Sequence, residues 1–211
     1  MHPHFGREPV IAGAPAARAA AVAVLVHGRD QDSGYMLDFW TGLGRTDVHC
    51  LLPEADERSW YPGRFYDPVE QNEPWLSGAL EAIEGAVAAA DRLGSLPIVL
   101  VGFSQGGCLV AEYLARMGIR SLAAAAVLTG SLMGTDVASR SMPESVRGFP
   151  VLVASSEADS WVAPRFVEQT AEVLRLAGAD LRVEMSGELE HRIGDRAAKA
   201  VDELFDRVIG G

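Results

Sequence analysis

Short aliphatic runs alternate along this chain with longer stretches of helical periodicity. Such alternation is typical of strand–helix–strand units built around a parallel sheet. Continuous apolarity within a run indicates a central strand that helices cover on both faces. Five runs are predicted as buried strands, at residues 22–26, 48–52, 98–101, 124–128 and 151–154, and a last, more alternating strand is predicted at 181–185.

Apolar residues spaced three and four positions apart predict helices, because this spacing places them on one helical face. Four covering helices are expected, at residues 76–93, 106–116, 165–177 and 195–209. Pro164 suits the first turn of the third helix, and Gly178 follows its end as a stop signal. The stretches 29–47 and 53–74 show no regular pattern throughout.

The chain has 211 residues, of which 48% are hydrophobic and 22% charged, the profile of a globular protein. A chain of this length forms one domain with a substantial core. We therefore predict a single α/β domain over residues 1–211, with a partly irregular segment at 1–20. Its expected architecture is a doubly wound, mostly parallel sheet with helices on both faces.

Charge and cysteine content exclude several classes of function. The 18 Lys and Arg residues stand against 29 Asp and Glu residues, so the formal net charge is −11. Lys199 is the only lysine, which argues against nucleic acid as a partner because phosphate binding needs clustered Lys and Arg. Cys50 and Cys108 lack zinc-ligand spacing and are too few for a disulfide framework, so we expect reduced, buried thiols and no metal site.

The apolar run at residues 19–26 resembles the core of a secretion signal. It is followed by HGRD at 27–30 instead of a small-residue cleavage site. No stretch approaches the roughly 20 apolar residues that a membrane span needs. We therefore expect a cytoplasmic protein without a membrane span.

The sequence GFSQGG at residues 102–107 follows a predicted strand and opens a predicted helix. In this context G-x-S-x-G forms a sharp turn, whose glycines lack the Cβ atoms that would clash with a serine in a strained conformation. The hydroxyl then lies at a helix N-terminus, where free N–H groups favour developing negative charge. Ser104 is the predicted nucleophile.

A serine nucleophile needs a base, and a neutral imidazole suits that task near pH 7. Of the five histidines, those at positions 2 and 4 fall in a segment expected to be frayed. His27 ends the first strand, and His49 lies inside a predicted buried strand. His191 lies in a polar loop between the last strand and the last helix, at the sheet edge where the serine turn opens. His191 is therefore the predicted base.

An acid must fix the tautomer of the imidazole and support its positive form. Asp159 follows the strand at 151–154 and completes the chain order Ser, Asp, His that suits this turn. Glu157 is the alternative, but it would have to reach across the turn. Two N–H groups must also bind the oxyanion of acyl transfer. We expect them from Gln105, directly after the nucleophile, and from Arg29 in the loop after the first strand.

Taken together, several segments resemble a known family. They are HGRDQDSGYM at 27–36, SWYPGRFYDPVEQNEPWLSGAL at 59–80, GFSQGG at 102–107 and the regions of Asp159 and His191. In this order they resemble the phospholipase/carboxylesterase family of α/β-hydrolases, which includes acyl-protein thioesterases. The resemblance covers nearly the whole chain from about residue 22. It implies the α/β-hydrolase fold, Ser104, Asp159 and His191 as a triad, and Arg29 and Gln105 as oxyanion donors.

The resemblance also implies hydrolysis of small carboxylic ester or thioester substrates, no cofactor and a shallow cleft. Three positions depart from the family pattern. Glu190 replaces a glycine before the histidine, Pro164 stands one residue later than usual after the acid, and Arg29 replaces a small or leucine-like residue. The guanidinium of Arg29 either contacts an anionic part of the substrate or is solvated.

The leading hypothesis is a cofactor-independent serine hydrolase that forms an acyl-enzyme. One alternative is an acyltransferase or lactone-processing enzyme, and another is a degenerate hydrolase that only binds a ligand. The expected partner is a small-molecule ester or thioester, and relatives point to a homodimer. Aromatic and apolar side chains either form an acyl pocket or are ordinary packing; these candidates are Trp60, Tyr61, Phe65, Tyr66, Leu132, Met133 and Trp161.

Overall fold

The computed structural model describes residues 4, 6–187 and 191–210. The strands are β1 (Val10–Gly13), β2 (Ala21–Val26), β3 (Val48–Leu52), β4 (Ile98–Phe103), β5 (Leu122–Leu128), β6 (Pro150–Ser156) and β7 (Asp180–Ser186). The helices are α1 (Ser33–Leu43), α2 (Trp75–Asp91), α3 (Gln105–Met117), α4 (Pro164–Leu176) and α5 (Asp195–Gly210). All six predicted strands and all four predicted helices are present.

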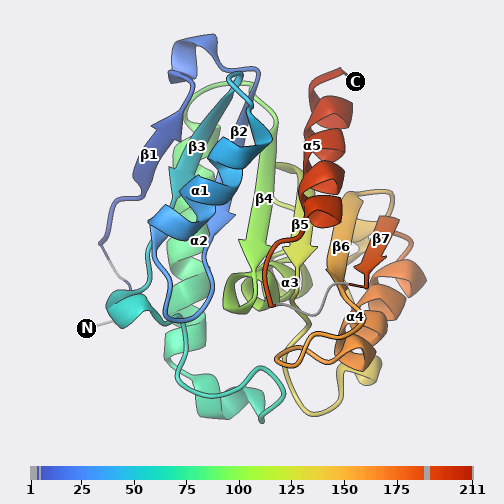
Figure 1. Cartoon of the computed structure of the whole chain (residues 1–211). Helices are drawn as coiled ribbons and strands as arrows, with labels where there is room; N and C mark the ends of the chain where they lie inside the picture. The colour runs from blue at the N-terminus through green and yellow to red at the C-terminus, as the bar shows by residue number, and fades with distance from the viewer. Residues whose placement is uncertain (1–3, 5, 188–190, 211) are drawn as a thin grey trace.

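The strands form one sheet in the order β1-β3-β2-β4-β5-β6-β7. All neighbouring pairs are parallel except β1 and β3, which pair antiparallel at one edge. In Figure 1, α1 and α5 lie in front of the sheet and α2 and α3 lie behind it. The predicted single α/β domain with a doubly wound, mostly parallel sheet is confirmed.

Two apolar layers enclose the sheet. Side chains of α1 and α5 pack with Leu25 and Val101 on one face, and side chains of α2, α3 and α4 pack with Val24 and Leu100 on the other. Successive strand residues point to opposite faces, so a strand covered on both sides needs an apolar residue at every position. All residues of β2 and β4 are buried, which explains their continuous apolarity.

Two elements were not predicted, β1 within the segment 1–20 and α1 within the stretch 29–47. Asp32 caps the N-terminus of α1, where its side chain accepts a hydrogen bond from the Gly34 amide at 3.0 Å, and Gly44 caps the C-terminus in a left-handed conformation. Only Met36 and Trp40 of α1 are buried, so its apolar periodicity is weak. The residues of β1 are mostly exposed, and its pairing with β3 holds it in place.

The strand order reverses between β2 and β4. After β2 the chain moves through α1 to β3 on one side, and after β4 it moves through α3 to β5 on the other. A crevice forms at the carboxyl ends of two strands whose connections diverge in this way. The loop after β2 carries Gly28 and Arg29, and the loop after β4 carries Ser104. The topology therefore places these residues at the same crevice.

Candidate active site

A cavity of about 590 Å³ lies above the carboxyl edge of the sheet. Ser104, His191, Arg29 and Gln105 all contribute to its lining. They come from the loops after β2, β4 and β7 and from the first turn of α3. The structure thus brings these four predicted residues together, although they come from three distant regions of the sequence.

Ser104 occupies the turn between β4 and α3, with φ of 55° and ψ of −116°. A positive φ is unfavourable for a residue with a Cβ atom. The neighbouring glycines allow the chain to close this turn: a Cβ on Gly102 would lie 2.2 Å from the carbonyl oxygen of Gly106, and a Cβ on Gly106 would lie 2.3 Å from that of Val26. The strained serine turn that the motif predicts is therefore present.

His191 connects the serine with a carboxylate. Its Nε2 lies 2.8 Å from Oγ of Ser104, and its Nδ1 lies 2.8 Å from Oδ2 of Asp159. The rings of Phe103 and Trp161 pack near the imidazole, with centroids 5.2 and 5.8 Å from its own. These contacts fix the orientation of the imidazole.

Asp159 is buried, with 5% of its surface exposed. Its Oδ1 accepts hydrogen bonds from the amides of Trp161 and Val162 at 2.7 and 2.8 Å, and its Oδ2 faces His191. Burial raises the pKa of this carboxyl, but the hydrogen bonds from His191 and the two amides together outweigh burial and lower the pKa below its ordinary value. Asp159 is therefore ionised at neutral pH. Glu157, the alternative acid, is exposed to solvent.

The side chains of Arg29 and Gln105 hold the aromatic segment against the sheet edge. The guanidinium of Arg29 donates to the carbonyl oxygens of Tyr61 and Pro62 at 2.9 and 3.0 Å, and also to that of Gly63. Nε2 of Gln105 donates to the carbonyl oxygen of Tyr61 at 2.8 Å. Main-chain carbonyl oxygens bind the guanidinium of Arg29, so it is not freely solvated. Its contact with an anionic part of the substrate stays a prediction.

The main chains of the same two residues lie close to the serine. Gln105 is the first residue of α3, and the first amides of a helix have no acceptor within the helix. Arg29 follows Gly28, which is so near the serine turn that a Cβ on Gly28 would lie 3.1 Å from Cβ of Ser104. Both residues therefore have a main-chain N–H in the neighbourhood of the serine hydroxyl.

Tyr61, Phe65, Tyr66 and Trp161 line the cavity, as the sequence predicts for a pocket. Trp161 is 72% exposed, which makes its ring accessible to a ligand. Five further lining residues were not predicted, although each lies within two positions of a predicted residue in the sequence. They are Asp30, Gly63, Arg64, Ser160 and Val162.

Three predicted pocket residues lie in the core instead. Trp60, Leu132 and Met133 have no exposed surface and do not line the cavity. Nε1 of Trp60 donates to the carbonyl oxygen of His27 at 2.9 Å. The main-chain amides of Leu132 and Met133 donate to buried side chains of α4 and α3. The pocket prediction is wrong for these residues, because interior packing and pocket lining select the same apolar residue types.

The predicted fraying of the N-terminus is wrong at His4, which is 2% exposed. Its Nδ1 accepts from the amide of Asp56 at 2.9 Å, and its Nε2 lies 2.9 Å from the carbonyl oxygen of Trp60. His49 is buried in β3 as predicted. His2 and Glu190 lie outside the described residues.

The two cysteines are free and buried, as predicted. Burial raises the pKa of Cys50 to about 12 and that of Cys108 to about 11, so neither thiol forms a nucleophilic thiolate at neutral pH. Within residues 4, 6–187 and 191–210, no group of three or more His, Cys, Asp or Glu side chains is arranged to hold a metal ion. No helix in the same part of the chain has the length and apolarity to cross a membrane.

The sheet order and the strained serine turn define a hydrolase-type enzyme with the α/β-hydrolase fold. The chain is similar to the phospholipase/carboxylesterase of Dyadobacter fermentans, with 27% identity over 94% of this chain and 95% of that one and a TM-score of 0.82. Esterase PE8 shares 19% identity over 95% of this chain and 98% of its own, with a TM-score of 0.76. SOBER1 of Arabidopsis thaliana shares 20% identity over 90% of this chain and 99% of its own, with a TM-score of 0.75.

No protein-family model matches this sequence, and no curated protein matches it. The likeness to the Dyadobacter structure extends over nearly the full length of both chains. The other two structures, at 19% and 20% identity, show the fold. The resemblance predicted from the sequence is therefore confirmed at the level of structure, and the chain is an enzyme of the serine hydrolase type.

Proposed function

We propose that this protein is a cofactor-independent serine hydrolase that cleaves small carboxylic esters or thioesters. Its nucleophile, base and acid are Ser104, His191 and Asp159. The observation that carries the proposal is the continuous pair of 2.8 Å hydrogen bonds that links the three side chains. Such a constellation is recognised by its geometry, whatever the order of its members in a sequence.

Acylation begins when His191 Nε2 accepts the proton of the Ser104 hydroxyl. The serine oxygen bonds to the carbonyl carbon, and the carbonyl π electrons move onto oxygen. The amides of Arg29 and Gln105 donate to this oxyanion, each contributing about 3–4 kcal/mol in the transition state. The ionised carboxylate of Asp159 supports the positive imidazolium. The alcohol or thiol then leaves with the proton from His191, and an acyl-enzyme remains.

Deacylation repeats these steps with water. His191 accepts a proton from water while the water oxygen bonds to the acyl carbon. Collapse of the second oxyanion releases the carboxylic acid, and the proton returns to Ser104. Water supplies the oxygen and the hydrogens that are added to the products, and His191 transfers the protons, so the proposed reaction needs no cofactor.

The cavity supports small, modestly hydrophobic or aromatic ester or thioester substrates. Tyr61, Phe65, Tyr66 and Trp161 contribute aromatic surface to its wall, and its volume of about 590 Å³ is within the usual range for small-molecule sites. The packing of an acyl group against this aromatic wall should determine which acyl groups the enzyme prefers. A cytoplasmic location and a homodimer stay predictions from the sequence.

A fluorophosphonate probe tests the nucleophile directly. The native protein should be labelled on one serine and should hydrolyse short aryl esters and thioesters. Ser104→Ala should abolish labelling and reduce turnover by several orders of magnitude, because it removes the proposed nucleophile. Ser95→Ala is the matched control, since Ser95 is exposed beyond the end of α2, and it should behave as the native protein does.

A folded native sample that neither labels nor hydrolyses any member of an ester and thioester panel would overturn the proposal. That result would favour a ligand-binding role instead. Adding a competing alcohol to the assay separates hydrolysis from acyl transfer. A new ester in place of the free acid would identify an acyltransferase.

A further inference from the structure

His27, the first residue of the loop after β2, is a buried histidine that takes no part in the proposed reaction steps. It is 1% exposed, and main-chain groups bind both ring nitrogens. Nε2 lies 3.1 Å from the Ala55 amide nitrogen, and Nδ1 lies 2.7 Å from the carbonyl oxygen of Gly28. An amide N–H can only donate, so Nε2 accepts. The ring proton is therefore on Nδ1 and is donated to Gly28.

The neutral tautomer is held in place by its surroundings. Burial lowers the pKa of His27 below its ordinary value, outweighing the opposite effect of the hydrogen bond to Gly28. The indole of Trp60 packs against the imidazole with ring centroids 5.0 Å apart. The same indole donates from Nε1 to the carbonyl oxygen of His27 at 2.9 Å. The direction of the Nδ1–H donor is therefore fixed.

The acceptor of this hydrogen bond belongs to a peptide group with a second role. The carbonyl of Gly28 and the amide N–H of Arg29 are parts of one peptide unit. That unit is trans, so its C=O and N–H point in opposite directions. When the carbonyl points at the buried imidazole, the N–H of Arg29 points away from it. Arg29 itself lines the cavity together with Ser104.

A peptide next to glycine needs such an anchor. Rotation of the Gly28–Arg29 peptide changes ψ of Gly28, and glycine offers little resistance to that rotation. A rotated peptide would present its carbonyl oxygen, instead of its N–H, to a developing oxyanion. The two negative oxygens would then repel each other.

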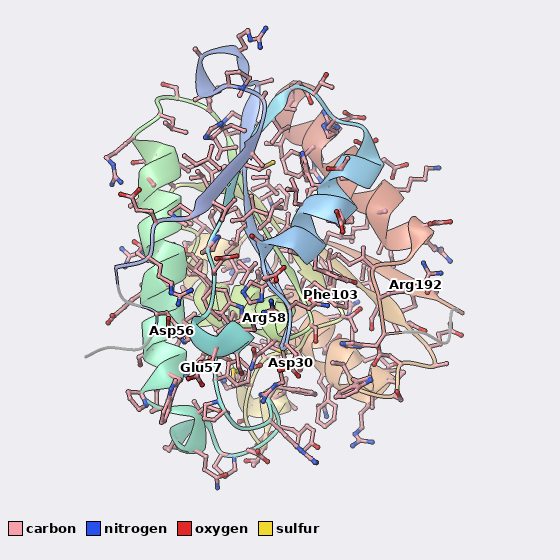
Figure 2. All side chains as sticks on the ribbon, turned by 60° about the vertical axis from the view of Figure 1, so that its left-hand side comes forward. Asp30, Asp56, Glu57, Arg58, Phe103 and Arg192 are labelled. Carbon is pink, nitrogen blue, oxygen red and sulfur yellow. The ribbon has the colours of Figure 1, made fainter. Side chains whose placement is uncertain are left out.

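The next residue restrains the loop from its other side. Asp30 has a left-handed φ of 59°, and its amide donates to the carbonyl oxygen of Arg58 at 2.8 Å. Arg58 is also left-handed, with φ of 59°, and Figure 2 shows the two residues on adjacent loops. The peptide between Gly28 and Arg29 thus lies between two fixed points, the imidazole of His27 and the carbonyl of Arg58.

We propose that His27 is a positioning residue, which holds the Gly28–Arg29 peptide so that the Arg29 amide faces the oxyanion. The inference rests on the proposed function, because it assigns a support to one of its two oxyanion donors. It concerns the transition state more than substrate binding, since the oxyanion exists only after the serine has attacked. Loss of the support should therefore lower kcat and leave KM nearly unchanged.

Two amide variants separate the two nitrogens of the ring. In His27→Asn, the side-chain nitrogen occupies the place of Nδ1 and can still donate to Gly28. In His27→Gln, the side-chain oxygen reaches the place of Nε2 and accepts from Ala55, but no donor faces Gly28. We expect kcat of the Gln variant to fall by about 10²-fold, the size of effect seen when one oxyanion donor is lost. The Asn variant should recover most of that loss.

A trifluoromethyl ketone gives a second readout, because its adduct with Ser104 carries an oxyanion. Its affinity should fall in His27→Gln in parallel with kcat and should recover in His27→Asn. Fluorophosphonate titration counts active sites, so kcat refers to folded enzyme only. His49→Gln is the matched control: this buried histidine also bonds a main-chain carbonyl, that of Ala14 at 2.8 Å, and its replacement should leave kcat and inhibitor affinity as in the native protein.

The outcomes distinguish the two proposals. A native protein without labelling or turnover overturns the proposed function itself. With an active native enzyme, unchanged kcat in the Gln variant, or equal losses in the Gln and Asn variants, overturns the role of His27. If the Gln variant does not fold, the amide proton of Arg29 in the native protein decides by NMR: a downfield shift on ketone binding supports the assigned orientation, and an unshifted signal overturns it.

Discussion

At the scale of single residues, the two oxygens of Asp159 have separate partners. Oδ1 accepts hydrogen bonds from two main-chain amides of the following turn, and Oδ2 accepts a hydrogen bond from His191. The amides cannot reverse their role, since an N–H group only donates. They therefore dictate which atom of any amide side chain at this position would face the imidazole.

This constraint predicts the effect of Asp159→Asn. The asparagine oxygen must stay on the amides of Trp161 and Val162, so its NH₂ group faces His191 Nδ1. That arrangement places the imidazole proton on Nε2 of His191. A protonated Nε2 cannot accept the proton of the Ser104 hydroxyl. We expect kcat to fall by about 10⁴-fold with little change in KM. Steady-state kinetics normalised by active-site titration measure this effect.

Glu157→Gln is the control for this variant, because Glu157 is exposed and precedes the acid by two positions. Its kcat should stay within about twofold of the native value, as expected for a surface substitution. A large loss in the control and a small loss in Asp159→Asn would reverse the assignment of the acid.

At the scale of elements, the aromatic segment between β3 and α2 has little regular structure of its own. It contains two short 3₁₀ helices, Asp56–Arg58 and Val69–Asn72. Hydrogen bonds from Arg29 and Gln105 attach its main chain at residues 61–63 to the crevice. The cavity wall therefore depends on side chains from the loops after β2 and β4.

Arg29→Met tests this dependence, because it removes the guanidinium and keeps the main-chain amide. Three hydrogen bonds to carbonyl oxygens are lost, so the 61–63 segment should loosen. We expect KM for aryl esters to rise about tenfold, a loss of about 1.4 kcal/mol that is close to the lower end of the range of about 1.5–3 kcal/mol for hydrogen bonds to charged groups. Because the amide donor persists, kcat should change less. Michaelis kinetics on an ester series measure both parameters.

Arg64→Met is the comparison for this experiment. Arg64 also lines the cavity, but its guanidinium lies over the ring of Tyr66 at 5.5 Å from the centroid. The Arg64→Met variant should raise KM less than the Arg29→Met variant does. Equal increases would show that positive charge at the cavity matters, rather than the attachment of the segment.

Secondary structure was predictable from the sequence where burial is one-sided or complete. The central strands have an apolar residue at every position, and α3 and α4 have strong apolar faces. The helix α1 has two glycines and only two buried residues, and the edge strand β1 is held by pairing with β3. Elements that are stabilised by caps or by strand pairing show little apolar periodicity in their sequence.

The site residues also differ in how far the sequence could predict their places. The convergence of Ser104, Asp159 and His191 was predictable, because acyl transfer demands these residue types and the carboxyl edge of a parallel sheet restricts their places. Trp60, Leu132 and Met133 were misplaced, since an apolar side chain serves a core as well as a pocket. The support from His27 was not predictable, because it depends on which carbonyl its Nδ1 reaches.

At the scale of the whole molecule, ionised carboxylates stabilise the fold. Partners in the folded state lower the pKa of several carboxyls that are at least partly buried, although burial raises it in each case. They are Asp47, Glu54, Glu73, Asp159 and Glu184. A carboxyl with a lowered folded-state pKa stabilises the protein above its unfolded pKa, and this stabilisation is lost as the pH falls through the folded-state pKa.

The free energy of unfolding should therefore be highest near neutral pH and decrease below about pH 4.5, where the unfolded chain takes up protons first. Urea titrations from about pH 7 to about pH 3 measure this trend. Asp159→Asn should make the decrease shallower, because it removes one of the linked groups. A free energy of unfolding that stays constant over this range would contradict the assignment.

The separation of Ser104 and His191 by 87 residues has a consequence for biosynthesis. A ribosome delivers the serine turn first, while His191, the proposed base, is still untranslated. An emerging chain therefore carries a chemically inert hydroxyl, because serine alone is a weak nucleophile. Phosphonylation of Ser104 by a fluorophosphonate during translation should then begin only when His191 reaches Ser104, so this reagent reports the final stage of folding.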